Sequence, residues 1–533
     1  MAFQWVINTA APSLSAWFPS SWYTAVGLVP AVAVLWYILS SVVAWYRLRH
    51  FPGPFFASFS YLWFARLTWR GNVHRDIVVE QEKYGPVMRS GPNQLLVHDP
   101  DTLWHINSMR SGYGRSVWYT AFRFDQSDHN VFTTTDTKLH DRRKAQLHSA
   151  YIGKGAIDLE KDVDSQLAVL VNHIRTKYLV RPIPGKASYA PLLDLSPLIR
   201  NLAIDFITLA GLGKAWGNVP TETDHYVFLQ MIDENVKLIH TFGVLPWVRK
   251  IISSDLFLKY AAPKPTDPKG IGRYLGVVKE EAGKRFKDGI PRAELGDAEF
   301  LHDGRGNMLD EWIKNGLPQR DAELELLIML SAGSETTAVT IRGTLLCLMS
   351  SPPAYQRLKK EIVEGIKEGR ISKPITNDEA KKIPYLQAII NEGMRMFPPL
   401  TVGFGKQVPP QGDTIHGKFV PGGAEIHVNL PSLMRNKQVF GDDIEVFRPE
   451  RFLEGTKEEI TRRFKTVELN FGHGRWQCLG KTLATIELNK VYVELFRAFD
   501  FQIVKLENPT HTTGYTSVLF DELIVRVVEA SID

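Results

Sequence analysis

The sequence is poor in cysteine, with only Cys347 and Cys478 among 533 residues. So few thiols exclude a disulfide framework. No long glycine-serine or charged low-complexity run divides the chain after Pro54, and no repeat of the length found in solenoids or propellers is visible. We therefore expect one large domain rather than a string of small ones.

The sequence also lacks the marks of a nucleotide-binding or nucleic-acid-binding protein. No glycine-rich dinucleotide fingerprint opens a βαβ unit, so no flavin or nicotinamide domain is expected. The net charge is only +5 and is spread along the chain. Such a charge predicts no nucleic-acid partner, but it is compatible with an anionic membrane surface.

Charged residues are absent from the first 46 positions. The apolar run from Trp22 to Tyr46 is longer than the about 20 residues that cross a bilayer, and Arg47 and Arg49 follow it. A cleaved signal peptide remains an alternative, but it would have basic residues before the run. We therefore expect a lumenal segment (1–21), a transmembrane signal anchor (22–46), a basic, proline-rich hinge (47–54) and a catalytic domain (55–533).

Cys478 follows directly after a glycine-rich loop, residues 471–477, and precedes an apolar helical pattern from Ala484 to Leu495. Glycines let a backbone approach a flat cofactor closely, and N–H groups at a helix start stabilise a thiolate. Cys478 is therefore a candidate axial ligand of haem iron. The alternative is a small buried residue in a tight turn.

Residues 321–351 are predicted to form one helix that begins with an acidic turn and stops before two prolines. The helix is apolar nearly all round and should be buried. Gly333 would thin it for a ligand, Thr336 could hold a water or bond a carbonyl one turn back, and Glu335 with Thr336 could relay protons. The alternative is a close helix crossing that needs small residues.

Glu392 and Arg395 stand three apart on a predicted helix that ends before Pro398 and Pro399. Such a pair is usually exposed and contributes about 0.5 kcal/mol. Apolar neighbours before it and the two prolines after it favour burial here. Arg451, further along the chain, supplies a second arginine.

Together these motifs resemble the cytochrome P450 family. The cysteine loop matches the family's haem-binding signature at Phe471, Gly472, Gly474, Cys478 and Gly480. Trp476 stands where the family has an arginine, and Arg475 lies one position earlier. The segment 332–337 resembles the family's oxygen-binding motif, and Glu392, Arg395 and Arg451 resemble its buried triad.

The resemblance implies a mainly α fold with small β-sheets, in one large helical domain behind the anchor. It also implies haem b with the Cys478 thiolate as the metal ligand. The catalytic residues would be Thr336, Glu335 and Gly333. The cofactor-binding residues would be Cys478, Phe471, Gly474, Arg475, His140, Lys144 and Lys406, with Arg143 as an alternative to Lys144. Removal of Glu392 or Arg395 from the triad should cause loss of haem.

The resemblance further implies a monooxygenase that inserts one oxygen atom from O2 into a hydrophobic small molecule, in secondary-metabolite biosynthesis. NADPH and flavin would act through NADPH-cytochrome P450 reductase, with cytochrome b5 as an optional second donor. The protein would sit in the endoplasmic reticulum membrane with its catalytic domain in the cytoplasm. The reductase would dock on a basic surface formed by Arg462, Arg463, Lys465, Arg475 and Lys481.

By the same resemblance, five segments should wall the substrate pocket: residues 111–132, 242–245, 331–332, 400–404 and 515–518. Their mainly apolar character suits a hydrophobic molecule of moderate size. Two other functions stay open. One is an isomerase or dehydratase of the same fold that needs no reductase, which the presence of Glu335 and Thr336 disfavours. The other is a non-catalytic haem sensor.

Overall fold

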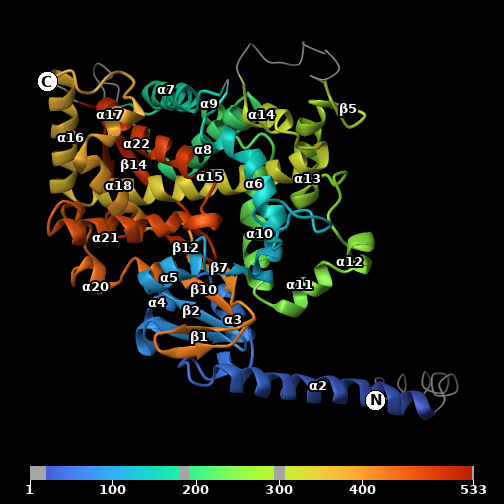
Figure 1. Cartoon of the computed structure of the whole chain (residues 1–533). Helices are drawn as coiled ribbons and strands as arrows, with labels where there is room; N and C mark the ends of the chain where they lie inside the picture. The colour runs from blue at the N-terminus through green and yellow to red at the C-terminus, as the bar shows by residue number, and fades with distance from the viewer. Residues whose placement is uncertain (1–19, 156, 180–190, 293–305, 531–533) are drawn as a thin grey trace, which may run out of the picture.

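The computed structural model describes residues 20–155, 157–179, 191–292 and 306–530. Helices dominate and small sheets lie among them (Figure 1), which confirms the predicted mainly α fold with small β-sheets. Except for its last two residues, the predicted lumenal segment 1–21 lies outside the described residues.

The chain enters through one long helix and builds its first sheet before the helical body. The elements up to residue 179 are α2 (Ser20–Leu48), η1 (Phe56–Ser58), α3 (Leu62–Trp69), α4 (Val73–Tyr84), β1 (Val87–Gly91), β2 (Gln94–Val97), α5 (Pro100–Asn107), β3 (Gly114–Arg115), η2 (Val117–Phe122), α6 (Thr137–Tyr151) and α7 (Leu159–Lys177).

The middle of the chain is almost entirely helical. Its elements are β4 (Leu193–Asp194), α8 (Leu195–Leu212), α9 (Asn218–Thr221), α10 (Phe228–Gly243), α11 (Pro246–Ile252), α12 (Asp255–Tyr260), α13 (Gly270–Gly283), β5 (Phe286–Lys287), β6 (Ile290–Pro291), α14 (Met308–Lys314), α15 (Gln319–Met349), α16 (Pro352–Lys367), α17 (Asn377–Lys381) and α18 (Pro384–Met396).

The C-terminal part returns to the first sheet and adds the cysteine loop. Its elements are β7 (Val402–Gln407), β8 (Asp413–Ile415), β9 (Lys418–Val420), β10 (Glu425–Asn429), α19 (Leu430–Leu433), α20 (Lys437–Phe440), η5 (Pro449–Phe452), α21 (Lys457–Glu468), η6 (Leu469–Phe471), η7 (Gly474–Trp476), α22 (Lys481–Ala498), β11 (Phe499–Ile503), β12 (Thr512–Gly514), β13 (Val518–Phe520) and β14 (Ile524–Glu529).

The largest sheet has the strand order β1-β2-β10-β7-β3. Strand β10 runs parallel to β2 and antiparallel to β7, so the sheet joins an early segment of the chain, near residue 95, to a late one, near residue 425. Its last pair sets Arg115 of β3 opposite Lys406 of β7. Because directly paired residues present their side chains on the same face, this register brings two cations together.

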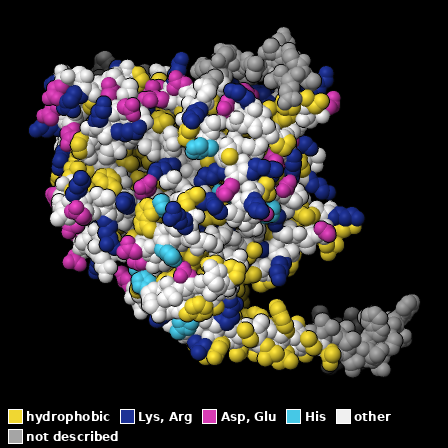
Figure 2. All heavy atoms as spheres, in the orientation of Figure 1, with side chains coloured by type: hydrophobic (Ala, Val, Ile, Leu, Met, Phe, Trp, Pro, Cys, Tyr) yellow, Lys and Arg dark blue, Asp and Glu magenta, His cyan; other side chains and the backbone are white. Residues whose placement is uncertain are grey.

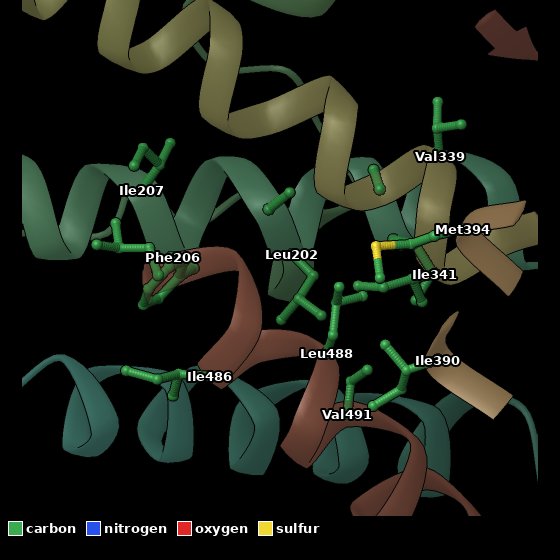
Figure 3. Close-up of a cluster of buried hydrophobic side chains, with 14 of the residues drawn as sticks. Leu202, Phe206, Ile207, Val339, Ile341, Ile390, Met394, Ile486, Leu488 and Val491 are labelled. Atoms are coloured by element: carbon green, nitrogen blue, oxygen red, sulfur yellow. The ribbon is translucent and has the colours of Figure 1, made fainter. Parts of the chain in front are cut away.

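The core is built around the crossing of α8 and α15. Both helices are apolar enough to cross a membrane, but 83% and 72% of their apolar stretches are buried inside the body. Figure 3 shows how α8, α15, α18 and α22 meet in a cluster that includes Phe206, Val339, Met394 and Leu488. Each such side chain contributes about 1.5 to 3 kcal/mol when it is fully buried.

Helix α2 differs from these core helices because it projects from the body (Figure 1). Only 11% of the stretch Ala31–Leu48 is buried. The helix ends on the body, where Arg47 donates a hydrogen bond to the Gly422 carbonyl over 2.6 Å. An imidazole nitrogen of His50 lies 2.6 Å from the Phe419 carbonyl oxygen. The segment that connects anchor and body is therefore in contact with the turns around β9.

Candidate active site

The cysteine loop is closed by its own backbone. The Cys478 N–H donates to the Phe471 carbonyl over 2.7 Å, and Gly472 and Gly474 have φ of 68° and 62°, a conformation that glycine adopts without strain. At Gly474 a Cβ atom would lie 2.4 Å from the Asn107 carbonyl oxygen, so that glycine also lets the loop pack against the end of α5. The loop therefore presents Cys478 from a fixed turn.

The Cys478 side chain is solvent-accessible, but its exposed surface belongs to an internal cavity. Burial raises the pKa of the Cys478 thiol, while the backbone N–H groups of Gly480 and Lys481 and the Lys144 ammonium lower it. These groups would stabilise the anionic form, and a thiolate is the form that binds a metal.

The cavity has a volume of about 270 Å³ and joins the cysteine loop to α15. Phe471, Cys478 and Thr336 all line it, within a mostly apolar wall. The wall also contains Glu487 of α22, whose pKa is raised well above its ordinary value by burial. Sequence reasoning missed this carboxyl group, which lies nine residues beyond the cysteine on a helix predicted only from its apolar spacing.

Helix α15 borders the cavity with two small residues and one hydroxyl side chain. Ala332, Gly333 and Thr336 line it, and the Thr336 hydroxyl donates to the Ala332 carbonyl one turn earlier over 2.9 Å. A Cβ atom on Gly333 would lie 2.9 Å from Ile207 Cγ1. Gly333 therefore permits the close crossing with α8 and also borders the cavity, so both interpretations of this glycine have support.

Glu335 requires a correction, because it does not pair with Thr336 as the sequence suggested. Its carboxylate accepts from Arg200 Nε over 2.7 Å and from Arg342 Nη2 over 2.5 Å, and it is not among the residues that line the cavity. Burial alone would raise the pKa of Glu335, but the two arginines lower it. Arg200 also makes a bidentate pair with Asp233 of α10, which is about half exposed. The acid is thus linked to the surface through Arg200.

Cations gather around Trp476, the residue that replaces the expected arginine. Arg115 and Lys406 lie over its ring, at 4.8 Å and 4.5 Å from the centroid, and the His140 ring packs against it at a tilt, with the ring centroids 4.4 Å apart. The Lys144 ammonium donates to the carbonyls of Arg475 and Gln477 over 2.7 and 3.0 Å. All four cationic or titratable side chains line the cavity.

The electrostatics of this cluster indicate an anionic ligand. Burial, with Arg115 and Lys144 nearby, pushes the pKa of Lys406 well below its ordinary value. Burial and Arg115 lower the pKa of His140 to about 4. Among the residues that the structure describes, no carboxylate forms an ion pair with Arg115, Lys144 or Lys406, and the buried Nε of Arg115 has no hydrogen-bond partner. A group with two carboxylates beside a flat apolar ring would fit this donor set.

Two sequence expectations about cations change. Arg475 is not among the residues that line the cavity, and its Nε lies 3.5 Å from an Asp141 carboxylate oxygen. Arg115, which the sequence analysis placed only within a pocket wall, takes part in the cluster instead. Its guanidinium donates to the carbonyls of Val131 and Phe132 over 2.5 and 2.8 Å. Only the pairing of β3 with β7 reveals this role.

Glu392, Arg395 and Arg451 form one network, and all three are fully buried. The Glu392 carboxylate accepts from Arg395 Nε and Nη2 over 2.7 and 2.8 Å and from Arg451 Nε over 3.0 Å. Arg395 also donates to the Met434 carbonyl, and the Met434 sulfur lies 3.7 Å from Asn470, next to Phe471. The network is therefore connected to the cysteine loop.

Comparison with known proteins gives a family for this arrangement. The cytochrome P450 family model matches residues 50–523. Cytochrome P450 monooxygenase aba1 of Botryotinia fuckeliana is 40% identical over 91% of this chain and 92% of its own length. Cytochrome P450 monooxygenase abl1 of Leptosphaeria maculans is 37% identical over 95% and 87%. Pisatin demethylase of Fusarium vanettenii is 28% identical over 90% and 91%.

This chain belongs to the cytochrome P450 family. Membership makes the protein a haem-dependent monooxygenase and implies a redox partner and a hydrophobic substrate. Cys478 and the cations around Trp476 line one cavity, and this donor set suits a haem with its carboxylates.

Three of the five predicted wall segments reach the P450 cavity. Tyr119, Phe132, Ala332, Leu400 and Phe404 line it, whereas no residue of 242–245 or 515–518 does. Phe206, Ile207 and Ile328 contribute instead. Near these two segments, Phe122 makes an edge contact with Phe132 and a tilted contact with His240, with ring centroids 6.1 and 5.5 Å apart. Which segments reach the cavity depends on tertiary packing, on which sequence spacing gives no information.

The predicted basic surface is partly used inside the molecule. Arg463 donates to the carbonyls of Val439, Arg451 and Glu454, and Lys481 pairs with Glu468. Arg462 and Lys465 are exposed, although Arg462 lies 3.1 Å from Asp101.

Proposed function

We propose that this P450 binds haem b through the Cys478 thiolate and oxygenates a hydrophobic small molecule of secondary metabolism. The observation that carries the proposal is a single cavity lined by Cys478, by Thr336 of α15 and by the cations around Trp476. When bound, a haem with a thiolate ligand supplies oxygen activation, because the thiolate favours O–O cleavage. The fungal relatives named monooxygenase and demethylase support this chemistry.

Thr336 is proposed as the residue that holds a proton donor at the reaction site. Its hydroxyl lines the cavity and bonds back to Ala332, so a small rotation would free it to donate. Glu335 would act on the proton supply electrostatically: its carboxylate is held by Arg200, which also pairs with the half-exposed Asp233, and the Arg200 guanidinium keeps its own proton. This arrangement keeps bulk water away from the cavity while it maintains a polar route to the surface.

Arg115, Lys406, His140 and Lys144 are proposed to bind the haem propionates. Arg115 and Lys406 lie over the Trp476 ring in cation–π contacts. Trp476 would therefore position two cations for the propionates, whereas the arginine expected at this position would bind a propionate directly. Phe471 would pack against the ring system near the ligand, and Gly474 would fix the loop.

The substrate is proposed to be apolar and of moderate size. Leu400, Phe404, Phe132 and Ile328 supply the wall on which it would lie. Few polar side chains in this part of the cavity would hold a strongly charged substrate, which favours a terpenoid, polyketide or similar skeleton.

The location follows from α2. We propose that α2 is a single-pass anchor in the endoplasmic reticulum membrane, with Arg47 and Arg49 and the catalytic body on the cytoplasmic side. NADPH-cytochrome P450 reductase would then deliver electrons from NADPH through flavin, with cytochrome b5 as an optional second donor. The exposed Arg462 and Lys465 would form part of the docking surface, by charge complementarity.

Spectroscopy and turnover test the proposal in two steps. The reduced carbon-monoxide complex should show the strongly red-shifted Soret band of thiolate ligation, and Cys478→His should abolish the shift. Product extracts of cells with and without the gene should then differ in an oxygenated metabolite whose formation in membranes requires NADPH and reductase. Turnover without NADPH would indicate an isomerase or dehydratase, and haem binding without any turnover would indicate a sensor.

A further inference from the structure

The segment 129–134 forms a turn that is buried although it belongs to no helix or strand. Asn130, Val131, Thr133 and Thr134 are all buried. Inside the turn, the Asn130 carboxamide oxygen accepts from the N–H groups of Phe132 and Thr133 over 3.0 and 2.9 Å. Because buried backbone groups outside regular structure still need hydrogen-bond partners, the remaining groups of the turn depend on side chains from other elements.

Two arginines bind carbonyl groups of the turn. Arg115 of β3 donates to the carbonyls of Val131 and Phe132, as described above, and Arg143 of α6 donates to the carbonyl of His129. Arg143 is not among the residues that line the cavity, so it takes part in this contact rather than in the cation cluster. The turn is therefore attached to both β3 and α6.

Glu325 of α15 binds the same turn through a backbone N–H group. Its Oε1 accepts from the Val131 N–H over 2.7 Å and lies 3.6 Å from Arg143 Nη1. The residue is 1% exposed, and its Oε2 is buried without a hydrogen-bond partner among the residues that the structure describes. The carboxyl group therefore has one hydrogen bond and one long ion pair to stabilise its charge.

Burial raises the pKa of Glu325 to about 8, against the lowering effects of Arg143, the Val131 N–H and Arg115. The charged or titratable side chains around it are Arg115 of β3, His129 of the turn, Arg143 and Tyr151 of α6, and Asp321 of α15. The arginines keep their protons, and Asp321 pairs with Arg143. Burial lowers the pKa of His129 and raises that of Tyr151 well above its ordinary value. Glu325 is therefore the group whose charge changes between pH 7 and pH 9.

This carboxyl group differs from the charges on the protein surface. On the face that Figure 2 shows, Lys and Arg side chains are mixed with Asp and Glu. Such charges are solvated and screened by salt, whereas Glu325 lies among buried side chains. A hydrogen bond to an ionised acceptor is about twice as strong as one to a neutral acceptor. Ionisation of Glu325 should therefore strengthen its bond to the Val131 N–H.

The turn forms part of the cavity wall. Val131 and Phe132 both line the cavity. The Phe132 ring makes edge contacts with Tyr119 and Phe122, with ring centroids 5.1 and 6.1 Å apart. A strong bond at the Val131 N–H would hold this part of the wall in place, and a weak bond would let it move away from a bound ligand.

We propose that Glu325 is a positioning residue of the cavity: when ionised, its carboxylate holds the turn 129–134 against α15 and fixes the wall at Val131 and Phe132, so that apolar ligands bind more tightly as the pH rises. The inference rests on the proposed haem-binding function, because ligands are expected to bind beside the haem. It adds to that function a control of ligand binding by pH.

Azole binding to the haem-loaded protein tests the proposal. The probe is 4-phenylimidazole, which binds haem iron through nitrogen and carries a ring that would contact the wall, and imidazole is the control without that ring. Kd is measured from the Soret shift between pH 7 and pH 9 in the parent, in Glu325→Gln and in Glu323→Gln. Glutamine keeps the shape of the neutral carboxyl group and cannot ionise. Glu323 is the matched control, since its carboxylate contacts Gln319 and Arg320 of the same helix.

Comparison of variant and parent at one pH cancels the titration of the azole itself. The Kd of Glu325→Gln for 4-phenylimidazole, divided by that of the parent, should rise from about 1 at pH 7 to about 5 at pH 9, with its midpoint near pH 8. For imidazole, and for Glu323→Gln, this ratio should not change with pH. A constant ratio for 4-phenylimidazole in Glu325→Gln would overturn the proposal. Absence of the red-shifted carbon-monoxide band in the parent would instead refute the proposed haem ligation.

Hydrogen exchange of the parent protein is a second measurement, which needs neither an azole nor a folded variant. After correction for the intrinsic effect of pH on exchange, the protection of the amides in residues 129–134 should rise about fivefold from pH 7 to pH 9. The amides of α16 serve as the control and should show no such rise. Equal pH dependence in the two segments would overturn the role of Glu325, whether or not the azoles bind.

Discussion

Removal of Glu392 should show that the buried triad contributes far more to stability and haem retention than an ordinary surface ion pair does. The carboxylate accepts four hydrogen bonds, from two nitrogens of Arg395, from Arg451 Nε and from the Arg448 backbone N–H. Glu392→Ala leaves two fully buried guanidinium groups without this counter-ion. Breaking a buried pair in this way costs about 3 to 5 kcal/mol, out of the about 5 to 15 kcal/mol that keep a domain folded.

The measurement is the molar ratio of haem to protein after purification, together with the urea midpoint of the holoprotein. A loss of 3 kcal/mol is about a 100-fold change in the folding equilibrium constant. We therefore expect most of the Glu392→Ala protein to be isolated without haem, and Glu392→Gln to retain more because its shape is kept. Glu364→Ala is the control, since Glu364 and Lys360 form an exposed pair 3.8 Å apart. Full haem content and an unchanged midpoint in Glu392→Ala would refute the reasoning.

Four further outcomes are expected. Thr336→Val should keep NADPH oxidation but divert it to peroxide, which the ratio of product to NADPH detects. Glu335→Gln should slow turnover about 100-fold and raise the solvent deuterium isotope effect, without loss of haem. Arg115→Met combined with Lys406→Met should release haem to apomyoglobin faster than either single change. The pKa of Glu222 is lowered to about 2 by hydrogen bonds that outweigh burial. The ionised carboxylate therefore stabilises the fold above about pH 4.5, and this stabilisation is lost as the pH falls toward 2. The urea midpoint should drop less between pH 5 and pH 3 in Glu222→Gln than in the parent.

Local motifs made part of this site predictable. The helix expected over 321–351 is observed as Gln319–Met349, because prolines before and after it set its limits. That Cys478 and Thr336 lie at one site could be predicted in the same way, since a glycine-rich loop and a polar interruption in an apolar helix are each recognisable within ten residues. The triad depended on resemblance for its third member, Arg451.

Contacts between distant segments could not be predicted. Arg115 enters the cation cluster only because β3 pairs with β7. Glu335 turns away from Thr336 because Arg200, 135 residues earlier, lies on the neighbouring helix α8. Arg475 was favoured for its charge, yet the direction of the loop aims Trp476 at the cavity instead. In each case the partner is chosen by tertiary packing, on which sequence spacing gives no information.

The cations around Trp476 also bear on how the protein is assembled in the cell. A newly made chain that closes around this cluster must bring Arg115, Lys144 and Lys406 together without an internal counter-charge. We expect the empty chain to reopen readily and to be recognised by proteases, whereas the haem carboxylates would neutralise the cluster and let the fold close. The supply of haem during synthesis should therefore limit the amount of this P450 that accumulates.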